Sequence, residues 1–207
     1  VCTSQEALFW KRPPKRLLIV GGGVIGCEFA CMMNAYGVEV TVVEMLPRLM
    51  PVLEPDLGEA MREIFEGRGM SILAGTRVEE MNAASGGISA KLSDGQTLEA
   101  DKCLVAVGRK PFTRDIGLES VGIETERGAI PVNDRMETSA DGVYCIGDAN
   151  GRWQLAHAAS AQGIVAAENA MGGDRVDDKP VPTGEYTFPE IASVGLACDR
   201  VLNGFLE

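Results

Sequence analysis

Apolar runs and amphipathic stretches alternate along the first half of the chain, and glycines separate them. Residues 17–20 form a continuous apolar run of the kind that is typical of a strand buried on both faces. Residues 24–36 carry apolar side chains on one helical stripe and end before Gly37, which predicts a helix. Residues 38–43 are rich in β-branched side chains and predict a second strand. This order favours a strand–helix–strand unit.

A second helix and a third strand extend this pattern. Asp56, followed three residues later by Glu59, predicts a capping box at the start of a helix. Residues 70–73 predict the third strand. From residue 77 to residue 100 short segments alternate with turn signals, which predicts an antiparallel meander. Residues 102–107 then return to a buried strand.

The second half of the chain is less regular. Residues 113–135 are rich in turn formers, and residues 142–146 predict one more apolar strand that ends at Gly147-Asp148. An Ala-rich helix is expected over residues 157–171. Residues 185–195 begin like a strand. The whole pattern predicts an α/β chain whose Rossmann-like domain contains an antiparallel β-meander insertion.

Composition narrows the class of partner. Hydrophobic residues make up 45% and charged residues 24% of the 207 residues, as in soluble globular proteins. The net charge of −11 disfavours nucleic acid, because binding phosphates requires a basic surface. No apolar run approaches the ~18 residues of a membrane helix, so we expect no membrane span. Residues 1–10 are followed by Lys11-Arg12-Pro13-Pro14 and contain no long apolar core, so we expect no secretion signal.

Cysteine and histidine usage argues against a metal centre. None of the six cysteines forms a CxxC or CxxxxC pair, and His157 is the single histidine. We therefore expect no metal site. Cys27 and Cys31 lie one helical turn apart and are interpreted as small buried apolar residues. This usage predicts a reducing, cytoplasmic setting.

The strongest chemical signal is a G-x-G-x-x-G pattern between the first strand and the first helix. Gly21 permits a tight turn, Gly23 lets the backbone approach a pyrophosphate, and Gly26 allows close packing. The N–H groups at the helix start favour a phosphate there. Glu44, at the end of the second strand, is expected to bind ribose hydroxyls and to repel a 2′-phosphate, which favours NAD over NADP. The alternative is a purely structural glycine-rich turn.

Gly147-Asp148 gives a second, weaker signal. An acidic group after a strand could bind a ribityl or ribose hydroxyl, but spacing alone favours a plain turn. The order of motifs is more specific than either signal. It runs through Gly21–Gly26 with Cys27-Glu28, Val42-Val43-Glu44, residues 106–111, Gly147-Asp148 and residues 155–159. This succession resembles the pyridine nucleotide–disulfide oxidoreductases, and among them the dihydrolipoamide dehydrogenase branch most closely.

The resemblance implies a role for each matching residue. Those expected at NAD are Gly21, Gly23, Val24, Ile25, Gly26, Glu28, Glu44, Gly108 and Arg109. Those expected at the flavin of FAD are Gly147, Asp148, Leu155, Ala156, His157 and Ala158. From its residues alone, His157 is interpreted as a structural histidine.

The resemblance also implies a domain organisation. The expected parts are a lead-in (1–15), an NAD-binding Rossmann-like domain (16–112), the C-terminal half of an FAD-binding domain (113–182) and the truncated start of a dimer-interface domain (183–207). Residues 186–195 carry the resemblance to the last of these. Residues 198–207 fit the family poorly and are interpreted as a truncation tail or an appended sequence.

The implied parent enzyme oxidises dihydrolipoamide and passes the electrons through FAD to NAD. The resemblance further implies a homodimer within a 2-oxo acid dehydrogenase or related lipoyl complex. The chain departs from the family because it has no CxxxxC redox pair, no N-terminal FAD fingerprint and no C-terminal HxxxxE pair. We therefore interpret it as an internal fragment without catalytic residues that itself binds only NAD(H). The alternatives are a non-catalytic dinucleotide-binding module, or a fragment of a sister flavoprotein such as mercuric reductase or NADH oxidase.

Overall fold

The computed structural model describes residues 1–84 and 86–195, which form two compact units. The first unit contains Val1–Gly108 and the segment from Gly184 onward, and the second contains Arg109–Thr183. The expected tail at 198–207, with Cys198, lies outside the described residues. The structure confirms the predicted fold class, an α/β chain with a parallel sheet and an antiparallel meander. Assigning the units to an NAD domain and half of a flavin domain stays a prediction.

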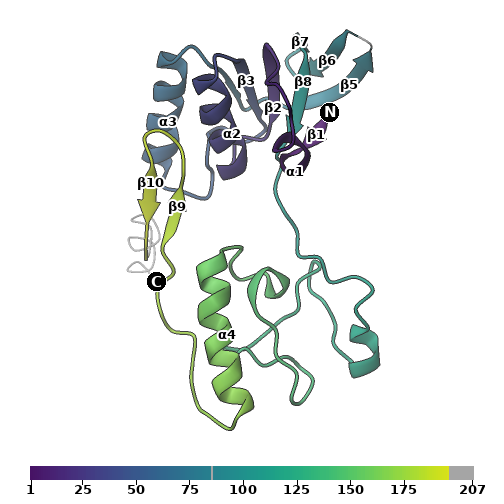
Figure 1. Ribbon diagram of the computed structural model, residues 1–207, viewed down its shortest axis with the longest axis vertical. Helices are drawn as coiled ribbons and strands as arrows, with labels where there is room; N and C mark the ends of the chain where they lie inside the picture. Colours follow the sequence, from purple (N-terminus) through teal and green to yellow (C-terminus); the bar gives the residue numbers. More distant parts are fainter. Residues whose placement is uncertain (85, 196–207) are drawn as a thin grey trace. The chain divides into compact units, whose positions relative to one another are not determined.

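A parallel sheet of five strands forms the middle of the first unit (Figure 1). Its strands, in the order β1-β8-β2-β3-β4, are β1 (Cys2–Thr3), β8 (Lys102–Val105), β2 (Arg16–Val20), β3 (Glu39–Glu44) and β4 (Ser71–Ala74). From β2 the chain moves outward through β3 to β4, and it returns on the other side of β2 as β8. The strand order therefore reverses between β2 and β8, and in open α/β sheets ligands bind at such a switch point.

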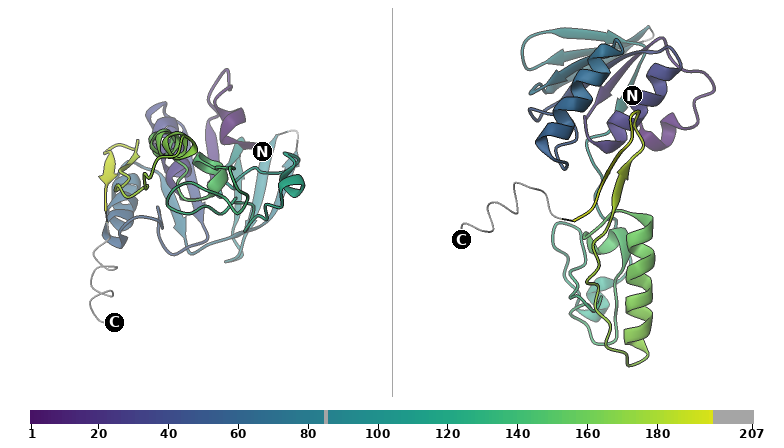
Figure 2. Two further views of the ribbon diagram at one scale, coloured as in Figure 1. Left: turned by 90° about the horizontal axis from the view of Figure 1, so that it is seen from below. Right: turned by 90° about the vertical axis from the view of Figure 1, so that its left-hand side faces the viewer.

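Helices cover one face of this sheet and the meander covers the other (Figures 1 and 2). The covering elements are α2 (Val24–Ala35) and α3 (Pro55–Gly67) on one side, and β5 (Val78–Ala84), β6 (Gly87–Leu92) and β7 (Thr97–Ala100) on the other. Within β2, Leu17 and Ile19 pack with the helices, whereas Leu18 packs with the meander. Because successive side chains of a strand point to opposite faces, a strand between two layers has to be apolar throughout.

Residues 1–15 do more than lead into the first domain. Cys2 and Thr3 pair in parallel with Leu104 and Val105, so β1 extends the sheet. The short helix α1 (Ser4–Ala7) follows and buries Ala7 in the core. A strand of two residues is too short to show a period, which explains why the pattern did not predict it.

The capping box predicted at Asp56 and Glu59 is wrong. Helix α3 begins at Pro55, which suits a first helical position because proline has no N–H to leave unpaired there. No side-chain cap is formed at its start, and Asp56 lies in the first turn. The Glu59 carboxylate pairs instead with the Arg62 guanidinium one turn further on.

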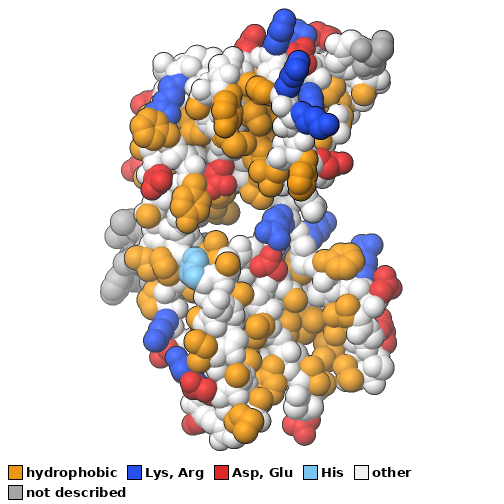
Figure 3. Space-filling view, in the orientation of Figure 1, with side chains coloured by type: hydrophobic (Ala, Val, Ile, Leu, Met, Phe, Trp, Pro, Cys, Tyr) orange, Lys and Arg blue, Asp and Glu red, His pale blue; other side chains and the backbone are white. Residues whose placement is uncertain are grey.

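The second unit has little regular structure apart from α4 (Ala156–Ala170), which confirms the predicted helix. Two short 3-10 helices, η1 (Leu118–Val121) and η2 (Gly147–Asn150), accompany it. The strand predicted at 142–146 is wrong, because within the described chain this segment forms only an isolated bridge from Tyr144 to Glu137. A strand needs a hydrogen-bonded neighbour along its length. Apolar side chains also remain on the surface of this unit (Figure 3).

The last described segment folds back onto the first unit. Strands β9 (Thr183–Glu185) and β10 (Ile191–Ser193) form a two-stranded sheet. Between them, the Tyr186 N–H donates to the Glu28 carboxylate on α2 at 2.9 Å. The strand-like character predicted for residues 185–195 is thus confirmed in part.

Candidate functional site

The glycine-rich turn connects β2 to α2, and each glycine of its G-x-G-x-x-G pattern has a separate steric reason. Gly21 has φ = +109°, and a side chain there would run into the carbonyl oxygen of Ala106. A side chain at Gly26 would run into the carbonyl oxygen of Gly21. At Gly23, by contrast, no atom lies within 4 Å of the place where a Cβ would sit. Gly21 and Gly26 therefore close the turn, and Gly23 leaves an open approach to the backbone.

The start of α2 is suited to an anion. Gly23 is its N-cap, no side chain caps it, and its first turn contains no acidic residue. The Cys27 N–H donates to the Gly23 carbonyl at 3.0 Å, so the helical ladder begins there. The preceding N–H groups of an α-helix have no partner within the helix. These groups, together with the open position at Gly23, fit the pyrophosphate of a dinucleotide.

Glu44 ends β3 with its side chain buried against the turn. Its Oε2 accepts a hydrogen bond from the Gly22 N–H at 2.6 Å, and its Oε1 accepts one from the Leu46 N–H at 2.7 Å. The carboxylate therefore shapes the same turn that would hold a nucleotide. Each carboxylate oxygen has two acceptor positions, so these bonds leave room for a further donor.

The other residues predicted at NAD, apart from Arg109, lie in the same unit as this turn. Val24 and Ile25 form the first turn of α2, and Ile25 packs on the core. Glu28, half-buried on α2, accepts from Tyr186 as described above. Gly108 is exposed after β8 and has φ = +112°. The structure thus brings together within the first unit every residue predicted at NAD except Arg109, which begins the second unit.

Within the second unit, Arg109 pairs with Asp148. The guanidinium Nη2 lies 2.9 Å from Asp148 Oδ2, and both side chains are partly exposed. Gly147 is buried with φ = +66°, and its N–H donates to Gln162 Oε1 at 2.8 Å. Sequence reasoning missed Gln162, although a glutamine within an Ala-rich apolar helix was a visible signal.

The remaining predicted flavin residues start α4. Leu155 is the N-cap, Ala156 and His157 are exposed, and Ala158 is buried. His157 Nε2 donates a hydrogen bond to the Pro182 carbonyl at 2.7 Å. The histidine therefore has a partner within its own unit.

The two cysteines of α2 differ in environment. Cys27 is buried, and this burial, reinforced by Cys31, raises the pKa of its thiol far above the usual value. Cys31 is half-buried, and its Sγ accepts the Phe188 N–H at 3.3 Å. The Cys27 thiol, which burial keeps neutral, is a poor nucleophile. Among the described residues no group of His, Cys, Asp and Glu side chains could hold a metal ion, and no helix is long and apolar enough to cross a membrane.

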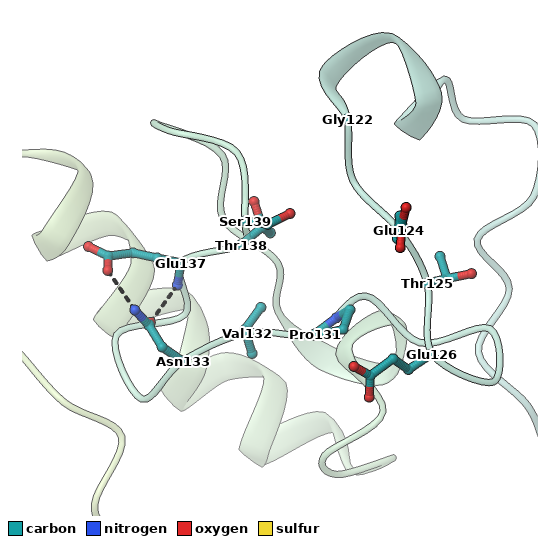
Figure 4. Close-up of a pocket in the computed structure, with 10 residues that line it drawn as sticks. All are labelled: Gly122, Glu124, Thr125, Glu126, Pro131, Val132, Asn133, Glu137, Thr138 and Ser139. Atoms are coloured by element: carbon teal, nitrogen blue, oxygen red, sulfur yellow. Dashed lines mark hydrogen bonds between the residues drawn. The ribbon is translucent and has the colours of Figure 1, made fainter.

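A pocket of about 640 Å³ opens elsewhere in the second unit (Figure 4). Carboxylates and hydroxyls line it, among them Glu124, Glu126, Glu137, Thr138 and Ser139. A hydrogen bond from Asn133, reinforced by Arg135, lowers the pKa of Glu137. None of the residues predicted to bind a cofactor lines this pocket.

Known proteins resemble the chain over almost its whole length. The profile of the pyridine nucleotide-disulphide oxidoreductase family matches residues 1–163. The dihydrolipoyl dehydrogenase of Chlorobaculum tepidum is 39% identical over 98% of this chain and 45% of its own length. The solved structure of LpdA from Mycobacterium tuberculosis superposes with a TM-score of 0.90 at 31% identity, covering 98% of this chain and 45% of that one.

A third similar protein is the HOCl-induced flavoprotein disulfide reductase RclA of Escherichia coli. In its Cu(II) complex it superposes with a TM-score of 0.90 at 30% identity, covering 98% of this chain and 48% of that one. The chain therefore spans about half the length of the relatives it matches.

Proposed function

Because the chain belongs to the pyridine nucleotide–disulphide oxidoreductase family, we propose that its first unit binds NAD(H) at the Gly21–Gly26 turn. The observation that carries this proposal is the open position at Gly23 beside the uncapped start of α2. The turn lies at the carboxyl end of β2, next to the switch point between β2 and β8. Backbone N–H groups at such an end bind pyrophosphate without needing a basic side chain.

Glu44 gives the proposal its preference for NAD(H) over NADP(H). A 2′-phosphate on the adenosine ribose would approach a carboxylate that already accepts two backbone N–H groups. Like charges at such a distance repel, so the phosphorylated nucleotide binds more weakly. Titration calorimetry of the chain with both nucleotides tests this, and NADP(H) binding as tightly as NAD(H) would refute it.

The Glu44→Ala variant needs a careful measurement, because it also leaves the Gly22 and Leu46 N–H groups unpaired. Damage to the turn lowers the affinity for both nucleotides, whereas loss of the charge changes their ratio. The ratio of the two dissociation constants is therefore the informative quantity, and we expect it to approach one. An unchanged ratio would assign the preference to another residue.

We further propose that the whole protein is an FAD- and NAD-dependent dihydrolipoyl dehydrogenase. The relatives of that name at about 40% identity support this activity. In such an enzyme Asp148 and the start of α4 would hold the flavin, which transfers a hydride to NAD. A homodimer, membership of a lipoyl-containing complex and a cytoplasmic location belong to the same proposal. The five described cysteines are free, which agrees with a reducing compartment.

The chain by itself supplies only part of this machinery. Dithiol oxidation requires a redox disulfide, a base and a two-electron carrier, and the sequence contains no CxxxxC pair. We expect the chain to purify without flavin absorbance and to form no NADH from dihydrolipoamide, even with added FAD. Turnover that Cys27→Ser or Cys31→Ser abolishes would overturn this view of the chain and of both cysteines.

The likeness to RclA favours a second candidate, a sister disulfide reductase with another substrate. The coding sequence on either side of this chain distinguishes the two. A CxxxxC motif upstream together with an HxxxxE motif downstream supports the dehydrogenase, and absence of the HxxxxE motif supports the sister enzyme.

A further inference from the structure

One buried side chain of α4 holds the turn that presents Asp148. Gln162 is 1% exposed, and its Oε1 accepts two hydrogen bonds. One comes from the Gly147 N–H at 2.8 Å and the other from Asn150 Nδ2 at 2.9 Å. These two residues begin and end η2, so both sides of Asp148 are tied to the same oxygen.

The rest of the turn depends on the same arrangement. Asn150 Oδ1 accepts the Arg152 N–H at 3.0 Å, and its Nδ2 also lies 3.4 Å from the Cys145 carbonyl. Gly147 adopts φ = +66°, a conformation that favours glycine, and its backbone lies against Ala159 of α4. The backbone conformation at Asp148 is thus set by hydrogen bonds that α4 supplies.

Gln162 is also costly to bury, because its Nε2 has no partner within the described chain. An unpaired buried donor destabilises a fold, so an apolar side chain at this position would be expected if packing alone mattered. Both hydrogen bonds that its oxygen accepts are short and come from residues of the Asp148 turn. The amide group of Gln162 therefore stabilises the Asp148 turn, and packing in the core does not explain why it is there.

We propose that Gln162 is a positioning residue for flavin binding, acting through the turn that orients Asp148. The proposal rests on the proposed function, in which Asp148 and the start of α4 hold the flavin. Because Gln162 belongs to the same helix as Leu155–Ala158, it fixes the distance between two parts of the flavin site. It does not touch the cofactor itself.

Helix α4 offers a matched control. Asn169 is also buried, and its side chain bonds the backbone of Arg135 and Arg175, away from the Asp148 turn. Replacing either residue by leucine removes side-chain hydrogen bonds from the same helix. Both Gln162→Leu and Asn169→Leu should lower thermal stability, but only Gln162→Leu should release the turn.

The first measurement uses the chain itself. Amide hydrogen exchange at Gly147 should become at least about tenfold faster in Gln162→Leu, since its N–H loses its acceptor, and should keep its rate in Asn169→Leu. Gln162→Glu retains an acceptor oxygen and should restore protection. Equal exchange rates in the wild type and Gln162→Leu would overturn the proposal.

The second measurement uses the full-length protein that contains this chain and follows the dissociation constant for FAD by flavin fluorescence. We expect Gln162→Leu to weaken FAD binding about tenfold, Gln162→Glu to restore most of it, and Asn169→Leu to leave it unchanged. Equal weakening in both leucine variants would make Gln162 merely structural and overturn the proposal. If the wild type binds FAD and Gln162→Leu binds it equally well, the positioning role is refuted and the proposed function stands. A wild type that binds no FAD refutes the proposed function as well.

Discussion

The two units of the chain reach a folded state by different means. The first places a parallel sheet between helices and a meander, so its strands find hydrogen-bond partners inside the unit. The second contains one long helix and two small apolar clusters, each with three buried residues among those described. Burial of apolar surface is the main favourable term in folding, so the first unit has far more to stabilise it.

The surface of the second unit agrees with this difference. Phe112 is 80% exposed, and Ile146 and Ile164 are exposed as well. The segment around Ile146 is apolar but lacks a pairing strand within the described chain. We infer that the second unit is the weaker of the two and opens first under denaturant, whereas the first unit keeps its fold.

The largest effects should come from truncating one core side chain in each unit, which tests whether the two units unfold separately. Phe65→Ala, in the core of the first unit, should cost about 3–5 kcal/mol, and Met136→Ala, in the second, about 2–5 kcal/mol. Trp10 lies in the first unit and Trp153 in the second, and they are the only tryptophans. In the Trp153→Phe background the remaining Trp10 fluorescence reports on the first unit, and in the Trp10→Phe background Trp153 reports on the second. Urea unfolding of each truncation is measured in both backgrounds.

Each truncation should move the midpoint of its own unit and leave the other within error. The Trp153 signal should also have the lower midpoint before any truncation is made. Coincident midpoints that shift together in both variants would mean that the chain unfolds as a single two-state domain, and the comparison between the units would fail.

The next largest effect concerns the nucleotide turn. A methyl group at Gly26 would run into the Gly21 carbonyl, so Gly26→Ala should destabilise the first unit by about 2–3 kcal/mol and abolish NAD(H) binding. Gly67, at the end of α3, has no atom within 4 Å of a built Cβ. Gly67→Ala should therefore be neutral or stabilise by about 0.5 kcal/mol. NAD(H) binding retained by Gly26→Ala in calorimetry would contradict this account of the turn.

Sequence pattern predicts the two units unequally well, and the reason is physical. The strands β2, β3 and β8 of the first unit are packed on both faces and its helices carry apolar stripes, so the local periodicity of the sequence reflects the packing directly. The glycine-rich turn is predictable as well, because its steric demands are local. The apolar pattern at residues 142–146 predicts burial too, but only Cys145 of this segment is buried, and strand formation depends on a neighbour that periodicity cannot supply.

Contacts between distant segments are the part that the pattern misses. The pairing of Cys2 with Leu104 joins residues about a hundred positions apart, and a strand of two residues shows no period. Gln162 escaped notice because its partners, Gly147 and Asn150, come together only through the fold. The hydrogen bond from the Gly22 N–H to Glu44 was missed for the same reason, since these two residues meet only when β3 lies beside β2.

A smaller effect distinguishes the units by thiol chemistry. Burial raises the pKa of Cys103 to about 11, and burial also raises the pKa of Cys27 in the same unit and of Cys145 in the second. Modification by a maleimide, mapped by mass spectrometry at mildly alkaline pH, should therefore spare Cys27 and Cys103. Cys145 should react sooner because its unit opens more often, and Cys145 reacting last would argue against the weaker second unit.

The raised thiol pKa values also make the stability of the first unit depend on pH. Above the ordinary thiol pKa the unfolded chain releases protons that the folded first unit retains, so its stability falls as pH rises toward about 11. Urea midpoints from the Trp10 signal should decline over that range. Cys103→Ala removes one of the titrating groups and should flatten the decline, whereas a decline of unchanged slope would exclude this thiol as its cause.

The smallest effect tests how the lead-in is attached. The Lys102 ammonium on β8 lies 4.4 Å from the centre of the Trp10 ring, so the charge links the segment after α1 to the sheet. Lys102→Met keeps most of the aliphatic stem and removes the charge, and it should cost about 0.5–1 kcal/mol. Lys91→Met on β6 removes the same charge from the same unit and serves as the control. In the Trp153→Phe background, the Trp10 emission should change and the midpoint should fall in Lys102→Met alone. Equal shifts in both variants would show that overall charge, rather than the contact with the ring, governs the attachment of residues 1–15.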